Sequence, residues 1–251
     1  MSKTVFITGA SSGFGEACAR HFAQAGFQLV LAARRIDRLS ALAEELNAVA
    51  VHCLSLDVRD REAVQGAVAT LPEAFRCVDV LINNAGLALG LEPAQDASLD
   101  DWDAMIDTNI KGLTYVTHAV LQGMVARNAG QIINIGSIAG SWPYPGGNTY
   151  CGTKAFVEQF SRGLRADLLG KNIRVSCLSP GMAETEFSLV RMKGDSDKAA
   201  SVYRDTVPLG ADDIASVVLW IAQSPAHINV NALELMPTCQ AWGPLAVSRS
   251  R

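Results

Sequence analysis

The stretch TVFITGASSGFGEACARHF, from Thr4 to Phe22, decides the fold of this chain. It begins with a short apolar run, continues through a glycine-rich turn, and ends in apolar positions at helical spacing, which predicts a strand, a loop and a helix. Gly9, Gly13 and Gly15 let the backbone approach a pyrophosphate, and the following helix offers unpaired N–H groups and the positive end of its dipole. The stretch therefore predicts a dinucleotide site, and the lack of a GK[ST] motif excludes a nucleotide-triphosphatase loop.

The remainder of the chain continues this alternation of strand and helix. Strands are predicted at 3–8, 27–33, 49–55, 78–83, 130–135, 172–178 and 230–235. Helices are predicted at 13–25, 37–47, 60–70, 101–127, 149–168 and 211–223. Crossovers of this length join neighbouring parallel strands, so the pattern predicts an α/β fold with a parallel sheet. A length of 251 residues with 49% hydrophobic content suits a single domain over 1–251.

The segment 181–209 interrupts the alternation. It is polar, carries Arg191, Lys193, Asp195 and Asp197, and follows a predicted strand. Ligands enter parallel sheets of this kind beyond the carboxyl ends of the strands. The segment is therefore predicted to form a lid over the ligand site.

A second informative feature is the pair Tyr150 and Lys154 in TYCGTKAF, with Ser137 upstream in INIGSIAG. Residues four apart share one face of a helix, so the phenol and the ammonium can meet. Lowering a tyrosine pKa from ~10 to about 7 requires roughly 4 kcal/mol. One cation at ~4 Å supplies about that much in an effective dielectric of ~20. The same spacing also occurs on ordinary half-buried helix faces, so the pair gains its meaning from the glycine turn.

Composition and charge exclude several classes of protein. The six cysteines are scattered without a CxxC pair, and the four histidines show no HxxxH or HxH spacing, so neither a disulfide framework nor a metal site is predicted. The net charge of −4 gives no basic surface for nucleic acid. No apolar segment is long enough to span a bilayer, and the N-terminus lacks a signal sequence, so a cytoplasmic protein is expected.

Several motifs stand in a fixed order along the chain. They are TGASSGFG at Thr8–Gly15, NNAG at Asn83–Gly86, Asn109 in TNIKG, Ser137, Tyr150 with Lys154, and PGMAET at Pro180–Thr185. In this order and spacing, the sequence resembles the short-chain dehydrogenase/reductase family over nearly its whole length. The resemblance implies a single-domain, Rossmann-type, doubly wound parallel sheet with strand order 3-2-1-4-5-6-7. It also implies a nicotinamide cofactor and hydride transfer as the reaction.

The residues that close the second predicted strand indicate which cofactor is used. Ala33 stands where NAD-dependent members of the family carry a carboxylate, and Arg34 and Arg35 follow it. A carboxylate repels a 2′-phosphate, whereas a guanidinium can bind one through two charge-assisted hydrogen bonds. NADP is therefore the expected cofactor, and a pair of solvated arginines opening a helix is the alternative. The resemblance implies that the cofactor-binding residues are Thr8, Gly9, Ser11, Ser12, Gly13, Phe14, Gly15, Arg34, Arg35, Asp57, Val58, Asn83, Ala85, Gly86, Tyr150, Lys154, Pro180, Gly181 and Thr185.

The resemblance also implies the catalytic residues. Tyr150 is expected to donate a proton to the oxygen of a carbonyl that receives a hydride, and the Ser137 hydroxyl to hold the same oxygen. Lys154 is expected to lower the pKa of Tyr150 and to hold the nicotinamide ribose. Asn109 is expected to anchor a water that links the lysine to solvent. Local sequence alone equally allows Asn109 to be a solvent-facing helix residue.

Within the family, the chain is similar to the NADP-dependent 3-hydroxy acid (serine-type) dehydrogenases and to the sulfoacetaldehyde reductases that form isethionate. The segments that carry this likeness are NNAGLALG, IDTN, GSIAGSWPYPGG, LVRMKGD and ELMPTCQAW. Both groups act on small molecules with an acidic end, so a cation is expected in the substrate site. Arg191 is the candidate, and an exposed loop arginine is the alternative. The resemblance places Tyr144 and Gln240 beside it, with Ser137 and Tyr150 at the carbonyl end.

The finer choice of substrate rests on two segments. PGMAETEF and the ending QAWGPLAVSR are closer to the sulfoacetaldehyde reductases, so the expected reaction is reduction of sulfoacetaldehyde to isethionate. The alternative is oxidation of a 3-hydroxy acid such as serine, allo-threonine or 3-hydroxypropionate, with malonate semialdehyde as the corresponding aldehyde. A cofactor-sensing scaffold without catalysis is a third possibility, and the intact catalytic residues argue against it. The predicted C-terminal tail, 236–251, reaches a neighbouring subunit in relatives, which implies a homotetramer or dimer of dimers.

Overall fold

A computed structural model describes residues 2–242 of the chain. Seven parallel strands of this part form one sheet with the order β3-β2-β1-β4-β5-β6-β7, which confirms the predicted topology. The strands are β1 (Thr4–Thr8), β2 (Gln28–Ala33), β3 (Val51–Ser55), β4 (Val78–Asn83), β5 (Gly130–Ile135), β6 (Ile173–Pro180) and β7 (Ala232–Leu235). Each boundary lies close to its predicted position, because short apolar runs between turns define these strands.

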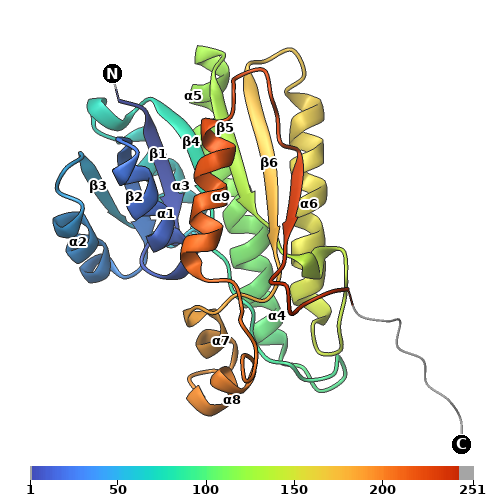
Figure 1. The fold of residues 1–251 in the computed structure, drawn as a ribbon. Coiled ribbons are helices and arrows are strands. Elements are labelled where there is room, and N and C mark those ends of the chain that lie inside the picture. The colour runs from blue at the N-terminus through green and yellow to red at the C-terminus, as the bar shows by residue number, and fades with distance from the viewer. Residues whose placement is uncertain (1, 243–251) are drawn as a thin grey trace, which may run out of the picture.

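Helices cover both faces of the sheet (Figure 1). The α-helices are α1 (Gly13–Gln24), α2 (Ile36–Glu45), α3 (Arg61–Ala69), α4 (Leu99–Ile106), α5 (Leu113–Arg127), α6 (Asn148–Asp167), α7 (Glu186–Arg191), α8 (Ser196–Ser201) and α9 (Ala211–Gln223). Three shorter helical segments are η1 (Glu73–Phe75), η2 (Asp107–Gly112) and η3 (Ile138–Gly140). Apolar side chains of α1, α2 and α9 form the core on one face of the sheet, and those of α3, α5 and α6 form it on the other. This arrangement leaves the carboxyl ends of the strands available to a ligand.

The helix predicted at 101–127 is interrupted in the structure. Helix α4 ends at Ile106, and the π-helical turn η2 follows before α5 begins at Leu113. Such a turn carries an additional residue and often marks a functional site, and apolar periodicity does not reveal it. The interruption places Asn109 inside the protein, where it is 1% exposed.

The predicted lid at 181–209 contains two short helices that the sequence pattern did not predict. The side chain of Thr185 caps α7, and that of Asp195 caps α8, each by accepting a hydrogen bond from a backbone N–H of the first turn. Both helices are too short to show an apolar period. A bridge between Ala183 and Leu209 joins the two ends of the segment. Figure 1 shows α7 and α8 beyond the end of the sheet.

The predicted tail, 236–251, is described as far as Trp242, and the rest of it lies outside the described residues. The indole of Trp242 donates a hydrogen bond to Glu234 at 3.3 Å, and its ring centroid lies 5.8 Å from that of Trp142. Within residues 2–242, no helix has the length and apolar character needed to cross a membrane. The same residues contain no group of three or more His, Cys, Asp or Glu side chains that could hold a metal ion.

Candidate active site

A cavity of about 350 Å³ lies at the carboxyl ends of the central strands. Its walls come from the turns after β1, β2, β3, β4 and β5, from α6, and from the start of the lid. The predicted cofactor-binding residues that line it are Gly9, Ser11, Ser12, Gly13, Phe14, Arg34, Arg35, Asp57, Val58, Ala85, Gly86, Tyr150, Lys154, Pro180, Gly181 and Thr185. The cavity therefore gathers segments that are far apart in the sequence.

The glycine turn presents backbone rather than side chains to this cavity. Gly9 has a φ of 65°, in the left-handed region that favours glycine, and a Cβ on Gly15 would collide with the carbonyl oxygen of Gly9. The Asn84 amide donates to the carbonyl oxygens of Thr8 at 2.9 Å and of Gly9 at 3.1 Å, which fixes the turn. Ser12 precedes α1 without forming a side-chain cap, so the N–H groups of the first turn remain for an anion. These features fit a pyrophosphate.

Two predicted cofactor-binding residues of the turn, Thr8 and Gly15, do not line the cavity. The Thr8 hydroxyl is buried and accepts hydrogen bonds from the backbone N–H groups of Asn84 and Ala85, both at 3.0 Å. Gly15 is buried where α1 approaches the turn. Both residues shape the turn, and their contact with the cofactor stays a prediction.

Asn83 also lies outside the lining of the cavity, and its contact with the cofactor stays a prediction. Its amide donates to Thr117 and Asn134 at 2.9 Å each, in the core between the sheet and α5. Neighbouring side chains on a strand point to opposite faces, and the motif NNAG alone does not say which asparagine faces the ligand. The structure places Asn84 in the cavity lining, a residue that the sequence interpretation missed.

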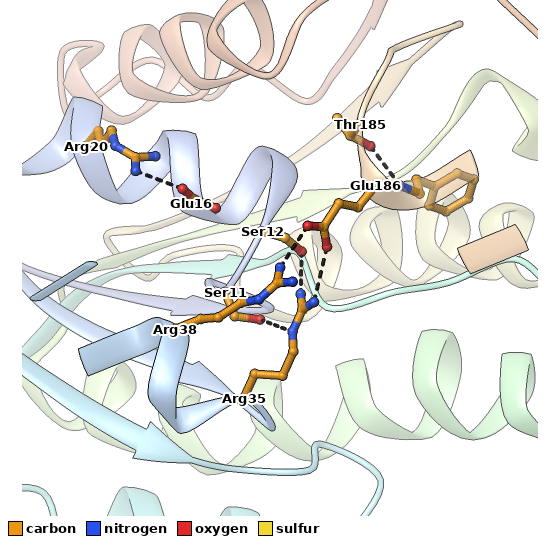
Figure 2. A network of polar contacts seen from close by, with 9 residues as sticks. Ser11, Ser12, Glu16, Arg20, Arg35, Arg38, Thr185 and Glu186 are labelled. Carbon is orange, nitrogen blue, oxygen red and sulfur yellow. Dashed lines mark hydrogen bonds and ion pairs between the residues drawn. The ribbon is translucent and has the colours of Figure 1, made fainter. Parts of the chain in front are cut away.

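Arg34 and Arg35 reach the cavity from the turn after β2. The Arg34 side chain is exposed at this position. Arg35 donates to the hydroxyls of Ser11 at 3.2 Å and Ser12 at 2.8 Å (Figure 2). Two guanidinium groups beside the glycine turn fit a phosphate dianion, as expected for the 2′-phosphate of NADP.

Glu186, the first residue of α7, is a further cavity residue that the sequence interpretation missed. Its carboxylate forms ion pairs with Arg38 at 2.7 Å and with Arg35 at 3.1 Å (Figure 2). Hydrogen bonds from Arg38 and Arg35 hold the pKa of Glu186 below its usual range. No local pattern could reveal this cluster, because its members lie about 150 positions apart.

The predicted catalytic residues meet at one end of the cavity. Tyr150 and Lys154 lie on α6 with exposures of only 8% and 7%, and Ser137 precedes η3. The Ser137 hydroxyl lies near enough to the Tyr150 phenol to lower the pKa of that phenol. The Lys154 ammonium donates to the carbonyl oxygen of Ile135 at 2.9 Å and lies 5.9 Å from the centroid of the Tyr150 ring.

Burial is the largest influence on the pKa of Tyr150. Desolvation raises this pKa above its ordinary value, and the Ser137 hydroxyl and the Arg191 guanidinium oppose the rise. The Lys154 ammonium is directed at the Ile135 carbonyl, and its role in lowering the pKa of Tyr150 stays a prediction. Burial also lowers the pKa of Lys154 to about 8. Both groups thus hold their protons at neutral pH, which suits a proton donor beside a cation.

Replacing Lys154 with methionine is expected to raise the free energy of unfolding of the cofactor-free protein by up to about 3 kcal/mol at pH 7. The pKa of Lys154 is about 8 in the folded chain against 10.5 in solvent. Below about pH 8 the lysine is protonated in both states, and the charged form is less favourable in the folded state, so the wild-type fold is destabilised by the full amount. Above that pH the unfolded chain binds more protons, and the wild-type stability rises toward that of the variant. Urea unfolding of both proteins at neutral and alkaline pH measures the gap, and a gap that does not narrow at alkaline pH would contradict this account.

Asn109 faces inward from η2. Its amide nitrogen donates to the carbonyl oxygen of Leu87 at 2.8 Å and to Thr153 at 3.0 Å, and its oxygen accepts from the Leu87 N–H at 2.9 Å. A Cβ on Gly86 would lie 3.2 Å from the Asn109 oxygen and 3.7 Å from the Lys154 nitrogen. These contacts exclude the solvent-facing alternative and place Asn109 beside the lysine. That Asn109 anchors a water between Lys154 and solvent stays a prediction.

Arg191, the last residue of α7, reaches the catalytic residues from the lid. Its side chain donates to the Tyr144 hydroxyl at 2.7 Å and to the carbonyl oxygen of Gly90 at 3.2 Å. The central carbon of the guanidinium lies 5.2 Å from the centroid of the Tyr144 ring and 5.6 Å from that of the Tyr150 ring. Arg191 is partly buried beside Tyr150, which excludes an exposed loop arginine. Arg191 and Tyr144 do not line the cavity described above, and their contact with substrate stays a prediction.

Gln240, the third residue predicted at the acidic end of the substrate, is part of the C-terminal tail and contacts the start of the lid. Its side-chain oxygen accepts a hydrogen bond from the Met182 N–H at 2.7 Å. A Cβ on Gly181 would collide with the same oxygen, so the glutamine packs tightly against the lid backbone. The structure thus shows Gln240 as an anchor of the lid, and its contact with substrate stays a prediction.

Comparison with known proteins gives consistent matches. Residues 3–194 match the model of the short chain dehydrogenase family. The chain is 57% identical to Sulfoacetaldehyde reductase 2 of Chromohalobacter salexigens, over 99% of this chain and 100% of that protein. It is 54% identical to the NADP-dependent 3-hydroxy acid dehydrogenase YdfG of Salmonella typhi, over 98% and 99% of the two chains. The closed form of serine dehydrogenase complexed with NADP⁺ aligns with a TM-score of 0.95 and 51% identity, over 98% of this chain and 100% of the other.

The family match and the geometry agree. The glycine turn, the Ser137, Tyr150 and Lys154 side chains, and the start of the lid all border one cavity at the carboxyl ends of the strands. The family model and the relatives cover most or nearly all of this chain. The chain belongs to the short-chain dehydrogenase/reductase family.

Proposed function

We propose that the protein is an NADPH-dependent reductase of small aldehydes that carry an acidic group, with sulfoacetaldehyde as the substrate and isethionate as the product. Its family and its relatives establish the coarser class, an NADP-dependent short-chain oxidoreductase. The observation that supports the acidic substrate is the Arg191 guanidinium, held over the rings of Tyr144 and Tyr150. A cation in this place would bind the negatively charged group of such a substrate.

The two ends of such a substrate require different groups. When bound, NADPH supplies the hydride that reduces the carbonyl carbon. Tyr150 donates a proton to the carbonyl oxygen, and the Ser137 hydroxyl holds the same oxygen in place. Arg191 binds the sulfonate or carboxylate with its planar guanidinium. Because Arg191 lies 5.6 Å from the Tyr150 ring, one short molecule can contact both residues.

The lining of the cavity supports the assignment of the cofactor. Arg34 and Arg35 would bind the 2′-phosphate, and the glycine turn with the first turn of α1 would bind the pyrophosphate. Asp57 would contact the adenine, Lys154 the nicotinamide ribose, and Thr185 the carboxamide. Each of these five side chains belongs to the same cavity.

A 3-hydroxy acid dehydrogenase is the second candidate. Relatives that bear this name are 52–54% identical to the chain, and a guanidinium binds a carboxylate as readily as a sulfonate. Its substrates would be serine, allo-threonine or 3-hydroxypropionate. The segments PGMAETEF and QAWGPLAVSR favour the sulfonate, since they are closer to the sulfoacetaldehyde reductases.

Steady-state assays with NADPH separate these two candidates. A sulfoacetaldehyde reductase is expected to show a kcat/KM for sulfoacetaldehyde at least about tenfold above that for malonate semialdehyde, because pockets commonly separate similar substrates by about 1–3 kcal/mol. Comparable or reversed values would favour the 3-hydroxy acid dehydrogenase. No NADPH consumption with either aldehyde would favour a scaffold without catalysis. Parallel assays with NADH check the cofactor, which is expected to bind more weakly without its 2′-phosphate.

We also propose a homotetramer or dimer of dimers in the cytoplasm. The oligomeric state comes from the family resemblance and from the predicted C-terminal tail. The part of that tail which the structure describes contacts the lid through Gln240, so the tail and the site are neighbours.

A further inference from the structure

A cluster of ion pairs joins two walls of the cofactor cavity. Glu186 begins the lid helix α7, and its carboxylate bridges Arg35 and Arg38 on the opposite wall, at 3.1 Å and 2.7 Å (Figure 2). Glu186 and Arg35 line the cavity, whereas Arg38 lies outside its lining. The first residue of the lid helix is thus tied to the segment that carries the arginines of the predicted 2′-phosphate site.

The bridge leaves room for a phosphate beside it. Arg35 donates from Nε to Ser11, from Nη2 to Ser12 and from Nη1 to Glu186. A guanidinium has five N–H groups, so these three hydrogen bonds leave two for another acceptor. Arg34 stands on the same turn with an exposed side chain and also lines the cavity. The carboxylate of Glu186 and a 2′-phosphate can therefore bind this group of arginines at the same time.

The charges of the cluster favour such joint binding. Arg34, Arg35 and Arg38 carry three positive charges against the single negative charge of Glu186, which leaves an excess that attracts a phosphate dianion. Thr185, directly before Glu186, lies against the glycine turn, because a Cβ on Gly13 would be 3.4 Å from the Cβ of Thr185. The start of the lid therefore packs across the cavity. The structural alignment with a closed, NADP⁺-bound relative is consistent with a closed lid.

We propose that Glu186 is the latch of the lid: its bridge to Arg35 and Arg38 holds α7 over the bound cofactor and slows the release of NADP. Glu186 and Arg38 are positioning residues, since they act through the lid rather than on reacting atoms. The inference rests on NADP as the cofactor of the proposed function and is independent of which aldehyde is reduced.

Release of NADPH measured by stopped-flow fluorescence, with excess NADP⁺ as the trap, tests the latch. Glu186→Gln is expected to speed release by about three- to tenfold and to raise Kd for NADPH by a similar factor, because two exposed ion pairs are lost. Arg38→Gln is expected to speed release by about two- to fivefold, because one of the pairs is lost while the cavity lining is unchanged. The double variant is expected to match Glu186→Gln alone, since Arg38 acts through Glu186.

Glu45→Gln is the matched control. Glu45 is an exposed carboxylate at the end of α2 that pairs with Arg20 of α1 at 2.7 Å, and it does not line the cavity. Its loss is expected to leave NADPH release unchanged. Higher ionic strength is expected to shrink the difference between wild type and Glu186→Gln, because salt screens the exposed pairs.

Two outcomes would overturn the latch. Unchanged release in both Glu186→Gln and Arg38→Gln would show that the bridge does not hold the lid over NADP. Tighter binding of NADPH by Glu186→Gln would show that the carboxylate competes with the 2′-phosphate. Failure of the wild-type protein to reduce sulfoacetaldehyde would count against the proposed substrate alone, because this experiment measures cofactor release without any aldehyde.

Discussion

Replacing Tyr150 with phenylalanine is expected to lower kcat for aldehyde reduction by about a thousandfold, within the range of about 10²–10⁴ for loss of a general acid. The phenol is buried, and burial raises its pKa, so it carries a proton that can be donated to a developing oxyanion. The Ser137 hydroxyl lies near the phenol but cannot replace a proton donor of this kind. Single-turnover oxidation of bound NADPH by sulfoacetaldehyde measures the loss.

The Tyr150 variant is expected to bind NADPH with an unchanged Kd, because the substitution removes a hydroxyl from a side chain that remains packed in the core. Tyr115→Phe is the matched control, since Tyr115 is a partly buried tyrosine that packs against the core from α5. It is expected to retain wild-type activity. Retention of more than about a tenth of the wild-type rate by Tyr150→Phe would remove the tyrosine from the role of general acid.

The second large effect is expected for Arg191→Gln, which should lower kcat/KM for sulfoacetaldehyde by about a hundredfold or more. Removal of one partner of a buried, hydrogen-bonded charge pair costs about 2–5 kcal/mol, and each ~1.4 kcal/mol is a factor of ten. The guanidinium lies over the rings of Tyr144 and Tyr150, and the Tyr144 hydroxyl holds it in place. The loss should fall mainly on substrates that carry a charge.

A neutral aldehyde of similar size separates the two effects of Arg191. Because the guanidinium also opposes the rise of the pKa of Tyr150, a smaller loss of up to about tenfold is expected for acetaldehyde, which has no acidic group. Arg204→Gln is the control, since Arg204 is an exposed arginine in the same lid segment. Equal losses for charged and neutral aldehydes would show that Arg191 acts on Tyr150 or on the lid and does not bind the acidic end.

The buried site carries a cost in stability. Tyr150 and Lys154 are both buried. Desolvation raises the pKa of Tyr150 and lowers that of Lys154, and in both cases it favours the uncharged form. For Lys154 this disfavours the ammonium at neutral pH, which is why its replacement by methionine is expected to stabilise the cofactor-free fold. The same burial keeps water away from the proton donor, so the site gives up stability where the chemistry requires a dry environment.

The fold was predictable because its signals are local. A buried parallel strand is a short apolar run between turns, and each such run in this chain became a strand of the sheet. The π-helical turn at 107–112 and the two helices of the lid were not predictable in the same way. An interruption of one turn, or a helix of six residues, is too short to change the apolar period.

The site was predictable wherever a motif fixes both residue type and position. Ser137, Tyr150 and Lys154 meet as expected, and Arg191 joins them from the lid. The NNAG motif was less informative, since it named Asn83 for the cavity while the structure places Asn84 there. The pleat of the strand decides that choice, and the sequence letters do not record it.

By itself, the sequence determined the α/β fold, the family, the dinucleotide site and the catalytic residues, because strand runs, glycine turns and helical spacings act over a few neighbouring positions. Only the tertiary structure decided that Lys154 is directed at the Ile135 carbonyl, and that burial raises the pKa of Tyr150. It alone also brought Glu186 to Arg35 across 151 positions of the chain. Desolvation and long-range ion pairs depend on how the whole chain packs, and packing brings together side chains whose proximity no local pattern encodes.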